Sequence, residues 1–261
     1  MSRELIVLSG GHPFDDEAFG ALLASLAGWT VTHLRHPEAE RLIGEGAAAQ
    51  ADALLFYDMP GYDFTGGTVA TRPPSEAFRR AIVDRFERGR GAVAMHHAIA
   101  GWADWPEWSE LVGGRFLYRP GEVRGVARLD SGYRHDVDYV AEVVADHPVT
   151  RGVPATFPVC DELYLAEVFE VDATPLIRAR HAFVREKFYS AEAAVSGRMF
   201  DNSGWDHPPG SDWIAWVKPA RNAPLVYLQF GDGPPTYANP AVRQVLANAL
   251  DFVATTPPPA T

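Results

Sequence analysis

Apolar residues in the first hundred positions form short unbroken runs, or alternating segments, that are separated by stretches with helical spacing. The runs and the alternating segment predict strands at residues 5–8, 29–34, 53–57 and 91–95. Helical spacing over residues 14–26 and 78–86, with acids in the first turn of one segment and Pro74 and Ser75 before the other, predicts two helices. This order of strands and helices is typical of a parallel sheet covered on both faces.

The second half of the chain has alternating segments that lie closer together. Residues 123–129 and 136–144 are separated by the turn-forming sequence Asp-Ser-Gly, which predicts an antiparallel excursion. Further strands are expected at residues 162–168, 174–180 and 224–230, and an insertion with one strand near its end at residues 181–219.

The closing segment is typical of a helix. Asn239 suits the N-cap, Pro240 suits the first helical position, and the apolar residues that follow have helical spacing. We therefore predict a single α/β domain at residues 1–255, built as a flavodoxin-like three-layer sandwich. Its sheet is expected to be mainly parallel with an antiparallel extension, and residues 256–261 are expected to form a disordered tail.

The net charge limits the classes of partner that we expect, and the cysteine content limits the disulfides that can form. The 261 residues carry a net charge of −11, which argues against nucleic acid and against an anionic membrane surface as partners. The single cysteine, Cys160, cannot form an intrachain disulfide, and the chain has neither a signal-peptide pattern nor a long apolar run. We expect a cytoplasmic protein, and the sequence leaves open whether it forms a homo-oligomer.

Polar residues follow three of the predicted strands, at the edge of the sheet where ligands bind in open α/β folds. His96 and His97 end the fourth strand and suit a general acid or base or a metal ligand, although hydrogen-bonded structural histidines are the alternative. His12 and Asp15 follow the first strand and could line the same crevice, where Asp15 could instead cap a helix. Asp58 ends the third strand and suits binding of ligand hydroxyls, or else formation of a turn.

Tryptophans are dense just after the two histidines. Trp102 and Trp105, and less so Trp108, could stack on the apolar face of a sugar ring. The alternative is a place in the hydrophobic core, which is the more common location of tryptophan.

Two acids and an aromatic residue form a further candidate group. Asp161 or Glu162 could orient a histidine, act as an acid, or complete a metal site of the two-histidine, one-carboxylate kind. A solvated strand start is the alternative, and without a His-x-x-x-His pair a metal is only weakly indicated, with His97 and Asp161 as its ligands if one is bound. No cysteine occupies the turn after the fourth strand, so cysteine-dependent amide hydrolysis is not expected.

Several motifs in the same order give the chain a resemblance to a known family. They are Ser-Gly-Gly-His at residues 9–12, Trp-Pro-Glu-Trp followed by Leu-Val-Gly-Gly at residues 105–114, His-Pro-Val-Thr-Arg-Gly at residues 147–152, Asp-Glu-Leu-Tyr at residues 161–164 and Tyr-Ala-Asn-Pro at residues 237–240. On these motifs the chain resembles the ThuA-like (trehalose utilisation) proteins, which are related in fold to the class I glutamine amidotransferases. One departure is Gly231-Asp232-Gly233, where the family commonly has Gly-His, so that any role of that histidine is absent or falls to Asp232.

The resemblance implies an enzyme of carbohydrate metabolism that acts on a small-molecule sugar or keto-sugar glycoside by histidine and carboxylate acid–base chemistry. Its catalytic residues would be His97, His96, Asp161 and Glu162, and its substrate-binding residues His12, Asp15, Asp58, Trp102, Trp105 and Tyr164. Two alternatives stay open. One is a non-catalytic sugar-binding or scaffold module on the same fold. The other is a hydrolase that depends on a divalent metal, Zn²⁺ or Mn²⁺.

Overall fold

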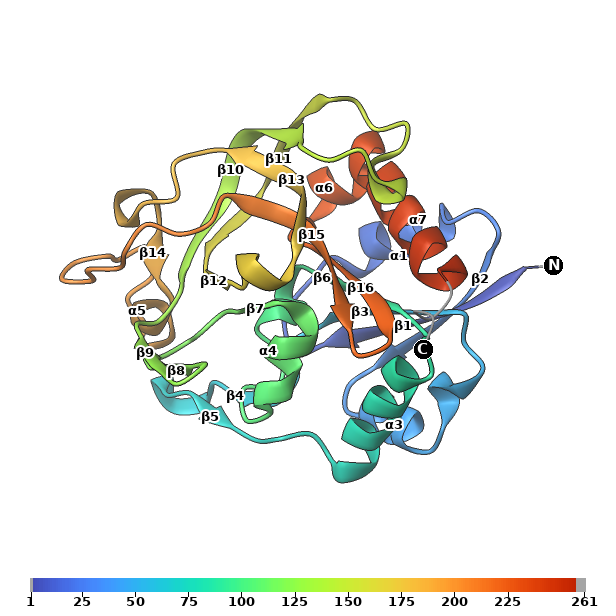
Figure 1. The fold of residues 1–261 in the computed structure, drawn as a ribbon. Helices are drawn as coiled ribbons and strands as arrows, with labels where there is room; N and C mark the ends of the chain where they lie inside the picture. Colours follow the sequence, from blue (N-terminus) through green and yellow to red (C-terminus); the bar gives the residue numbers. More distant parts are fainter. Residues whose placement is uncertain (1, 257–261) are drawn as a thin grey trace.

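The computed structural model describes residues 2–256 (Figure 1). Its α-helices are α1 (Asp16–Ala24), α2 (Glu38–Gly44), α3 (Glu76–Glu87), α4 (Pro106–Val112), α5 (Ala191–Val195), α6 (Pro234–Ala238) and α7 (Pro240–Thr255). Its strands are β1 (Arg3–Gly10), β2 (Trp29–Arg35), β3 (Ala53–Asp58), β4 (Tyr62–Asp63), β5 (Ala70–Thr71), β6 (Ala92–Met95), β7 (Gly114–Arg115), β8 (Gly121–Val123), β9 (Val126–Arg128), β10 (Gly132–Val143), β11 (Thr156–Leu165), β12 (Glu167–Val168), β13 (Thr174–Arg180), β14 (Tyr189–Ser190), β15 (Trp213–Ala220) and β16 (Ala223–Leu228).

One large sheet organises the described residues. Its strands follow the order β11-β10-β13-β15-β16-β6-β3-β1-β2, and β14 pairs with β10. From β16 to β2 all neighbours are parallel, whereas from β11 to β16 all neighbours are antiparallel. The predicted α/β fold, with a parallel sheet and an antiparallel extension, is therefore confirmed.

Helices cover both faces of the parallel strands, as Figure 1 shows. Because successive side chains of a strand point to opposite faces, β1 contributes to two separate cores. Leu5 and Val7 pack with residues of α1 and α7, whereas Ile6 and Leu8 pack with residues of α3 and α4. The unbroken apolar run at the start of the chain thus indicates a strand buried on both sides, and the predicted three layers are present.

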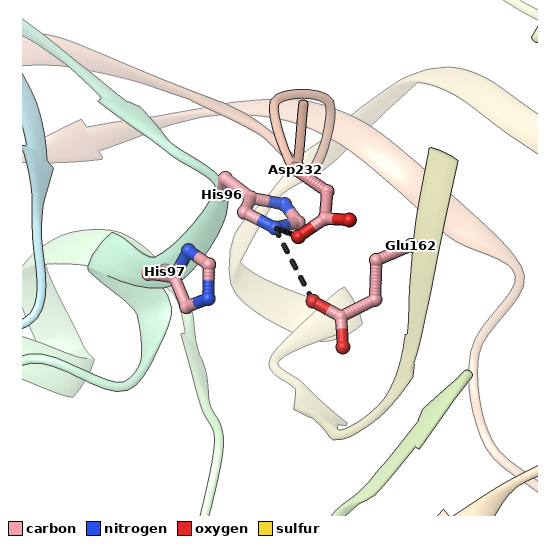
Figure 2. A group of neighbouring side chains, drawn as sticks. All are labelled: His96, His97, Glu162 and Asp232. Carbon is pink, nitrogen blue, oxygen red and sulfur yellow. Dashed lines mark ion pairs between the residues drawn. The ribbon is translucent and has the colours of Figure 1, made fainter. Parts of the chain in front are cut away.

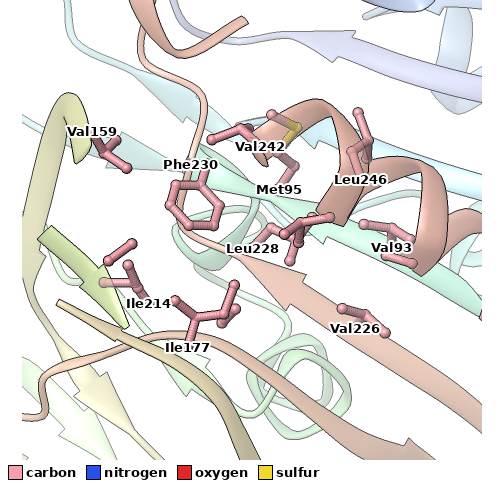
Figure 3. Close-up of a cluster of buried hydrophobic side chains, with 14 of the residues drawn as sticks. Val93, Met95, Val159, Ile177, Ile214, Val226, Leu228, Phe230, Val242 and Leu246 are labelled. Carbon is pink, nitrogen blue, oxygen red and sulfur yellow. The ribbon is translucent and has the colours of Figure 1, made fainter. Parts of the chain in front are cut away.

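The core under α7 joins the two halves of the sheet (Figure 3). Val93 and Met95 of the parallel half share it with Ile214 of the antiparallel half, and Val242 and Leu246 of α7 pack on them. All five side chains are at most 2 % exposed. Each fully buried side chain of this size contributes about 1.5–3 kcal/mol to folding, so this core fixes the antiparallel extension relative to the parallel strands.

Helix caps confirm the boundaries read from the sequence. The Ser75 side chain accepts a hydrogen bond from the N–H of Phe78 at the start of α3. The Asn239 side chain accepts from the N–H of Ala241 at the start of α7, and Pro240 is the first helical residue.

The structure corrects two strands of the middle region. Residues 123–129 were expected to form one strand, but they belong to the hairpin of β8 and β9, which turns at Arg124 and Gly125. Both turn residues have positive φ (52° and 76°), as tight hairpin turns require. The expected strand at residues 162–168 begins earlier, at Thr156, so that its acidic pair lies inside β11 rather than at a solvated strand start.

The expected insertion at residues 181–219 contains a central strand of the sheet. Its last part is β15, which lies between β13 and β16.

The helix α6 was not predicted from the sequence, because Pro234 and Pro235 there suggest a loop, although proline is well tolerated in the first turn of a helix. Of the expected tail, residues 257–261 lie outside the described part of the chain. Over residues 2–256 there is no helix with the length and apolar character needed to cross a membrane.

Candidate active site

The turn after β6 places two histidines at the carboxyl end of the parallel strands. The strand ends at Met95, and a short 3₁₀ turn follows from His96 to Ile99. His96 has a positive φ of 52°, a conformation that costs a residue other than glycine about 1–3 kcal/mol and that recurs at active sites and ligand clamps.

His96 lies at the centre of a polar cluster (Figure 2). Its Nδ1 donates a hydrogen bond of 2.6 Å to the carbonyl oxygen of Gln229, so its Nε2 faces the other way. Nε2 lies 2.9 Å from the hydroxyl of Tyr164, 3.3 Å from Oε2 of Glu162 and 3.6 Å from Oδ1 of Asp232. The ring of His96 is 0 % exposed, which means that this cluster meets solvent through other residues.

Glu162 and Tyr164 approach His96 from β11. They are two residues apart on the strand and therefore share a face, whereas Asp161, the residue before Glu162, points to the opposite face. In the sheet order β11 and β6 are separated by four strands. The antiparallel half of the sheet must therefore curve over the carboxyl ends of the parallel strands to bring Glu162 and Tyr164 to His96.

Asp161 holds the loop that carries Asp232. Its two carboxylate oxygens accept hydrogen bonds of 2.9 Å from the backbone N–H groups of Gly231 and Asp232. Gly231 has a φ of 133°, and a Cβ there would lie 2.9 Å from the side chain of Met95. Burial raises the pKa of Asp161 to about 6, against the opposing effect of His96 and the two N–H groups. Asp161 therefore holds this loop from behind the cluster.

A β-bulge brings a third histidine to the cluster. In β10 the pairing with β11 shifts between Arg134 and Val137, so that His135 and Asp136 together face Glu162. The Nδ1 atom of His135 lies 3.3 Å from Oε1 of Glu162 and 3.9 Å from Oδ2 of Asp232. Glu162 thus bridges His96 and His135, and the His135 side chain is 39 % exposed.

The carboxylates set the charge of the two histidines that they contact. Burial lowers the pKa of His96, but Asp232 and Glu162 outweigh it and raise that pKa to about 10. Asp232 also raises the pKa of His135. Although burial opposes it, the two histidines in turn hold the pKa of Asp232 well below its usual value.

His97 and His12 form a separate neutral pair beside the cluster. Their rings stack at 3.8 Å, and His12 also lies within 2.9 Å of the carbonyl oxygen of Pro13. Burial lowers the pKa of both rings, and each is near another histidine that lowers it further. Among the described residues, the buried Nδ1 atom of His97 has no hydrogen-bond partner.

Four of these residues could hold a metal ion together. His96, His97, Glu162 and Asp232 each offer one ligand atom, and these atoms lie within 4.8 Å of one another. The predicted pairing of His97 with Asp161 does not match this group, because the neighbouring acid Glu162 faces the histidines instead.

Other predicted residues lie outside the cluster. Asp15 is exposed and caps α1 by accepting from the N–H of Ala18, as its alternative interpretation anticipated. Asp58 is buried, and its Oδ2 lies 2.7 Å from Nε2 of His36, outside the cluster.

The tryptophans occupy the core rather than an open wall. Trp102 and Trp105 are at most 4 % exposed, and Trp108 stacks on Trp105 and donates its indole N–H to the carbonyl of Ala98. In this structure none of these rings presents a face to a sugar, in agreement with the alternative of core packing.

The sequence does not single out His135, and it suggests for Asp232 only the replacement of a family histidine. His135 lies just before Val137 in the bulge of β10 and faces Glu162, whereas Val137 and Tyr139 face the opposite core, so strand parity alone does not place His135 at the site. The bulge and the curvature that complete the site depend on tertiary packing and leave no local pattern.

A cavity of about 420 Å³ lies elsewhere, beside α4 and the hairpin of β8 and β9, and its lining includes Tyr62 and Asp104 but no cluster residue.

One family model and several solved structures match this chain. The family model ThuA, described as trehalose utilisation, matches residues 8–253. Comparison with curated proteins gives no match.

Solved structures show the same fold at low sequence identity. A ThuA-like protein from Parabacteroides merdae is 12 % identical with a TM-score of 0.69, covering 100 % of this chain and 93 % of its own. A ThuA-like protein from Bacteroides uniformis is 17 % identical with a TM-score of 0.60, covering 96 % and 91 %. A glutamine amidotransferase from Thermotoga maritima is 9 % identical with a TM-score of 0.49, covering 98 % of this chain and 100 % of its own.

Proposed function

Because the chain belongs to the ThuA (trehalose utilisation) family, we propose that it is an enzyme that moves a proton at a carbon next to the carbonyl group of a keto sugar. The observation that carries this proposal is the half-exposed His135, whose Nδ1 faces two carboxylates. We assign His135 as the general base and the cluster around His96 as its support.

A carboxylate-held imidazole is suited to proton abstraction. Glu162 and Asp232 hold the proton of His135 on Nδ1, which leaves the lone pair of Nε2 for the substrate. The C–H bond breaks, its proton moves to Nε2, and the electron pair moves onto the carbonyl oxygen as an enolate. If the proton on Nε2 is replaced by one from solvent and returns to the same carbon, the hydrogen is exchanged. If instead the enolate oxygen takes a proton, the neighbouring hydroxyl loses one, and Nε2 protonates the former carbonyl carbon, the sugar is isomerised.

His96 supports this step without contacting substrate. It is fully buried and shares Glu162 with His135, so it fixes the carboxylate that orients the base. Positive charge on His96 also offsets one of the two carboxylates beside it.

Aromatic side chains next to His135 suit a carbohydrate. Phe200 is 57 % exposed, and its ring centroid lies 6.4 Å from that of His135 and 5.5 Å from that of Tyr189. The N–H of Phe200 donates a 3.1 Å hydrogen bond to the hydroxyl of Tyr133, which fixes its loop. An apolar ring face at this place can stack on the C–H face of a sugar, the role that the sequence suggested for tryptophans.

The arrangement is less suited to glycoside hydrolysis by paired carboxylates. Such enzymes place one carboxyl group on each side of the glycosidic bond. Here Glu162 and Asp232 both face His96 and His135, so neither is free to flank a sugar from the opposite side.

The test follows exchange of substrate hydrogen with solvent. Keto sugars and keto-sugar glycosides are incubated with the protein in D₂O, and deuterium at the carbon next to the carbonyl is followed by NMR. We expect catalysed exchange with at least one sugar, and a loss of at least about 100-fold in its rate for His135→Gln. His33→Gln, which changes an exposed histidine on β2, is the matched control and should keep the wild-type rate.

Two results would contradict the proposal. One is exchange in His135→Gln at the rate of His33→Gln. The other is the absence of any exchange together with a thermal shift by a sugar, which would support a non-catalytic sugar-binding module instead.

A further inference from the structure

We propose that His96, His97, Glu162 and Asp232 bind one divalent transition-metal ion of the Zn²⁺ or Mn²⁺ class. One ligand atom from each residue lies within 4.8 Å of the other three, and the four residues come from the turn after β6, from β11 and from the loop after β16 (Figure 2). The site goes beyond the proposed reaction and does not depend on it.

His96 has the arrangement of a metal-ligating histidine. Such residues donate one ring N–H to a carbonyl or carboxylate, which fixes the tautomer and presents the other nitrogen to the ion. The Nδ1 of His96 makes this bond to Gln229 at 2.6 Å, and its Nε2 faces Glu162 and Asp232.

The spacing of the donor atoms fits a coordination sphere. Ligands about 2.0–2.1 Å from a tetrahedral ion are about 3.4 Å from one another. Nε2 of His96 lies 3.3 Å from the nearer oxygen of Glu162 and 3.6 Å from that of Asp232. Only small side-chain movements would bring these atoms around an ion.

His97 supplies a ring nitrogen that has no hydrogen-bond partner among the described residues. Its Nδ1 is buried and has no hydrogen-bond partner, and a buried imidazole nitrogen without a partner is unfavourable. Coordination through Nδ1 would give this atom a partner. The stacking of His97 on His12 fixes the ring plane before an ion arrives.

The supporting residues fix the carboxylate ligands as well. Asp161 binds the backbone N–H groups of Gly231 and Asp232, so the loop that carries Asp232 is held in place. The two ligand carboxylates together neutralise the charge of a divalent ion.

The donor set indicates the class of metal. Two imidazoles and two carboxylates suit Zn²⁺, Mn²⁺ and related ions, whereas Ca²⁺ and Mg²⁺ prefer oxygen ligands alone. Asp232 is 31 % exposed and His135 is 39 % exposed beside it, so the solvent side of the group can admit a further ligand. An ion with an open position is typical of catalytic rather than structural sites.

The test measures ion binding without any sugar. Full-length protein is stripped with a chelator, exchanged into chelator-free buffer and titrated with Zn²⁺ and with Mn²⁺ by calorimetry, with Mg²⁺ and Ca²⁺ for comparison. We expect one Zn²⁺ or Mn²⁺ per chain at micromolar or lower Kd, and binding of Mg²⁺ and Ca²⁺ at least about 10-fold weaker. Glu162→Gln and Asp232→Asn should each weaken binding by at least about 10-fold.

His36→Gln is the matched control. It removes another buried histidine that is paired with a carboxylate, that of Asp58. Within residues 2–256, this pair does not belong to a group of three or more possible metal ligands. Asp232 lies on a loop and is partly exposed, so Asp232→Asn should remain folded even if Glu162→Gln does not. The inference is overturned if the wild type binds neither ion below millimolar concentration, or if Asp232→Asn and His36→Gln bind equally well.

Failure of this site and failure of the proposed reaction are distinguishable. Ion binding without hydrogen exchange in any sugar would contradict the reaction alone. If the wild type binds no ion in the titration but the stripped protein still exchanges substrate hydrogen, the metal site alone is contradicted.

Discussion

Nε2 of His96 lies 3.3 Å from Oε2 of Glu162, although the strands beside these residues are separated by four others in the sheet. The contact closes the curved antiparallel half over the carboxyl edge of the parallel half. Glu162 continues the connection to His135, so a buried histidine and a half-exposed one share a single carboxylate. The chemistry proposed for this protein depends on that bridge.

Removing the charge of the bridge should abolish most of the activity. Glu162→Gln keeps the size of the side chain but no longer holds the Nδ1 proton of His135 electrostatically. We expect kcat/KM for hydrogen exchange to fall by at least about 100-fold. Glu142→Gln, which changes an acid paired with Arg180 on the surface, should have no effect, and equal activity of the two variants would show that the bridge is not needed.

Loss of the exposed ring should affect binding rather than chemistry. Phe200→Ala removes a stacking surface whose ring centroid lies 6.4 Å from that of His135. An aromatic contact contributes about 0.5–1.5 kcal/mol, so we expect KM to rise up to about 10-fold while kcat stays within about twofold. Steady-state kinetics separate these terms, and a fall in kcat at constant KM would rule out the stacking role.

Asp161 should matter for stability because it satisfies two backbone donors. Asp161→Ala leaves the N–H groups of Gly231 and Asp232 without their acceptor in a buried place. We expect a loss of about 1–3 kcal/mol in the free energy of unfolding, measured in urea. Asp138→Ala, at an exposed position of β10, is the control. Similar unfolding midpoints for both variants would contradict this role.

Protein that has been stripped of metal ions with a chelator should lose stability at alkaline pH. The carboxylates raise the pKa of His96 to about 10 in the folded state, above its usual value near 6.5 in the unfolded chain. The stabilisation is fully present below about pH 6.5 and is lost as the pH rises toward 10. We expect the Tm of the wild type to fall over this range more steeply than that of His96→Gln, and parallel profiles would argue against the charged pair.

Much of the fold could be read from local patterns. The unbroken run in β1 and the caps at Ser75 and Asn239 depend only on burial and on backbone hydrogen bonding, and the structure agrees with them. The hairpin at Arg124 and Gly125 was missed because its strands are too short to show a period.

The candidate site could be read only in part. Histidines at the end of β6 and acids in β11 were selected, because strand ends and unusual polar residues are visible in sequence. Which acid meets the histidines depends on strand parity, and the entry of His135 depends on a bulge. The pairing of Asp58 with His36 depends on the loop between β2 and α2, and no pattern near Asp58 indicates it.

The most direct test of the account is a crystal structure with a bound keto sugar or an unreactive analogue. We predict that the carbon next to its carbonyl lies about 3–3.5 Å from Nε2 of His135, with a ring face against Phe200. A sugar bound instead in the cavity beside α4, against Tyr62 and Asp104 and away from His135, would contradict the assignment of the active site.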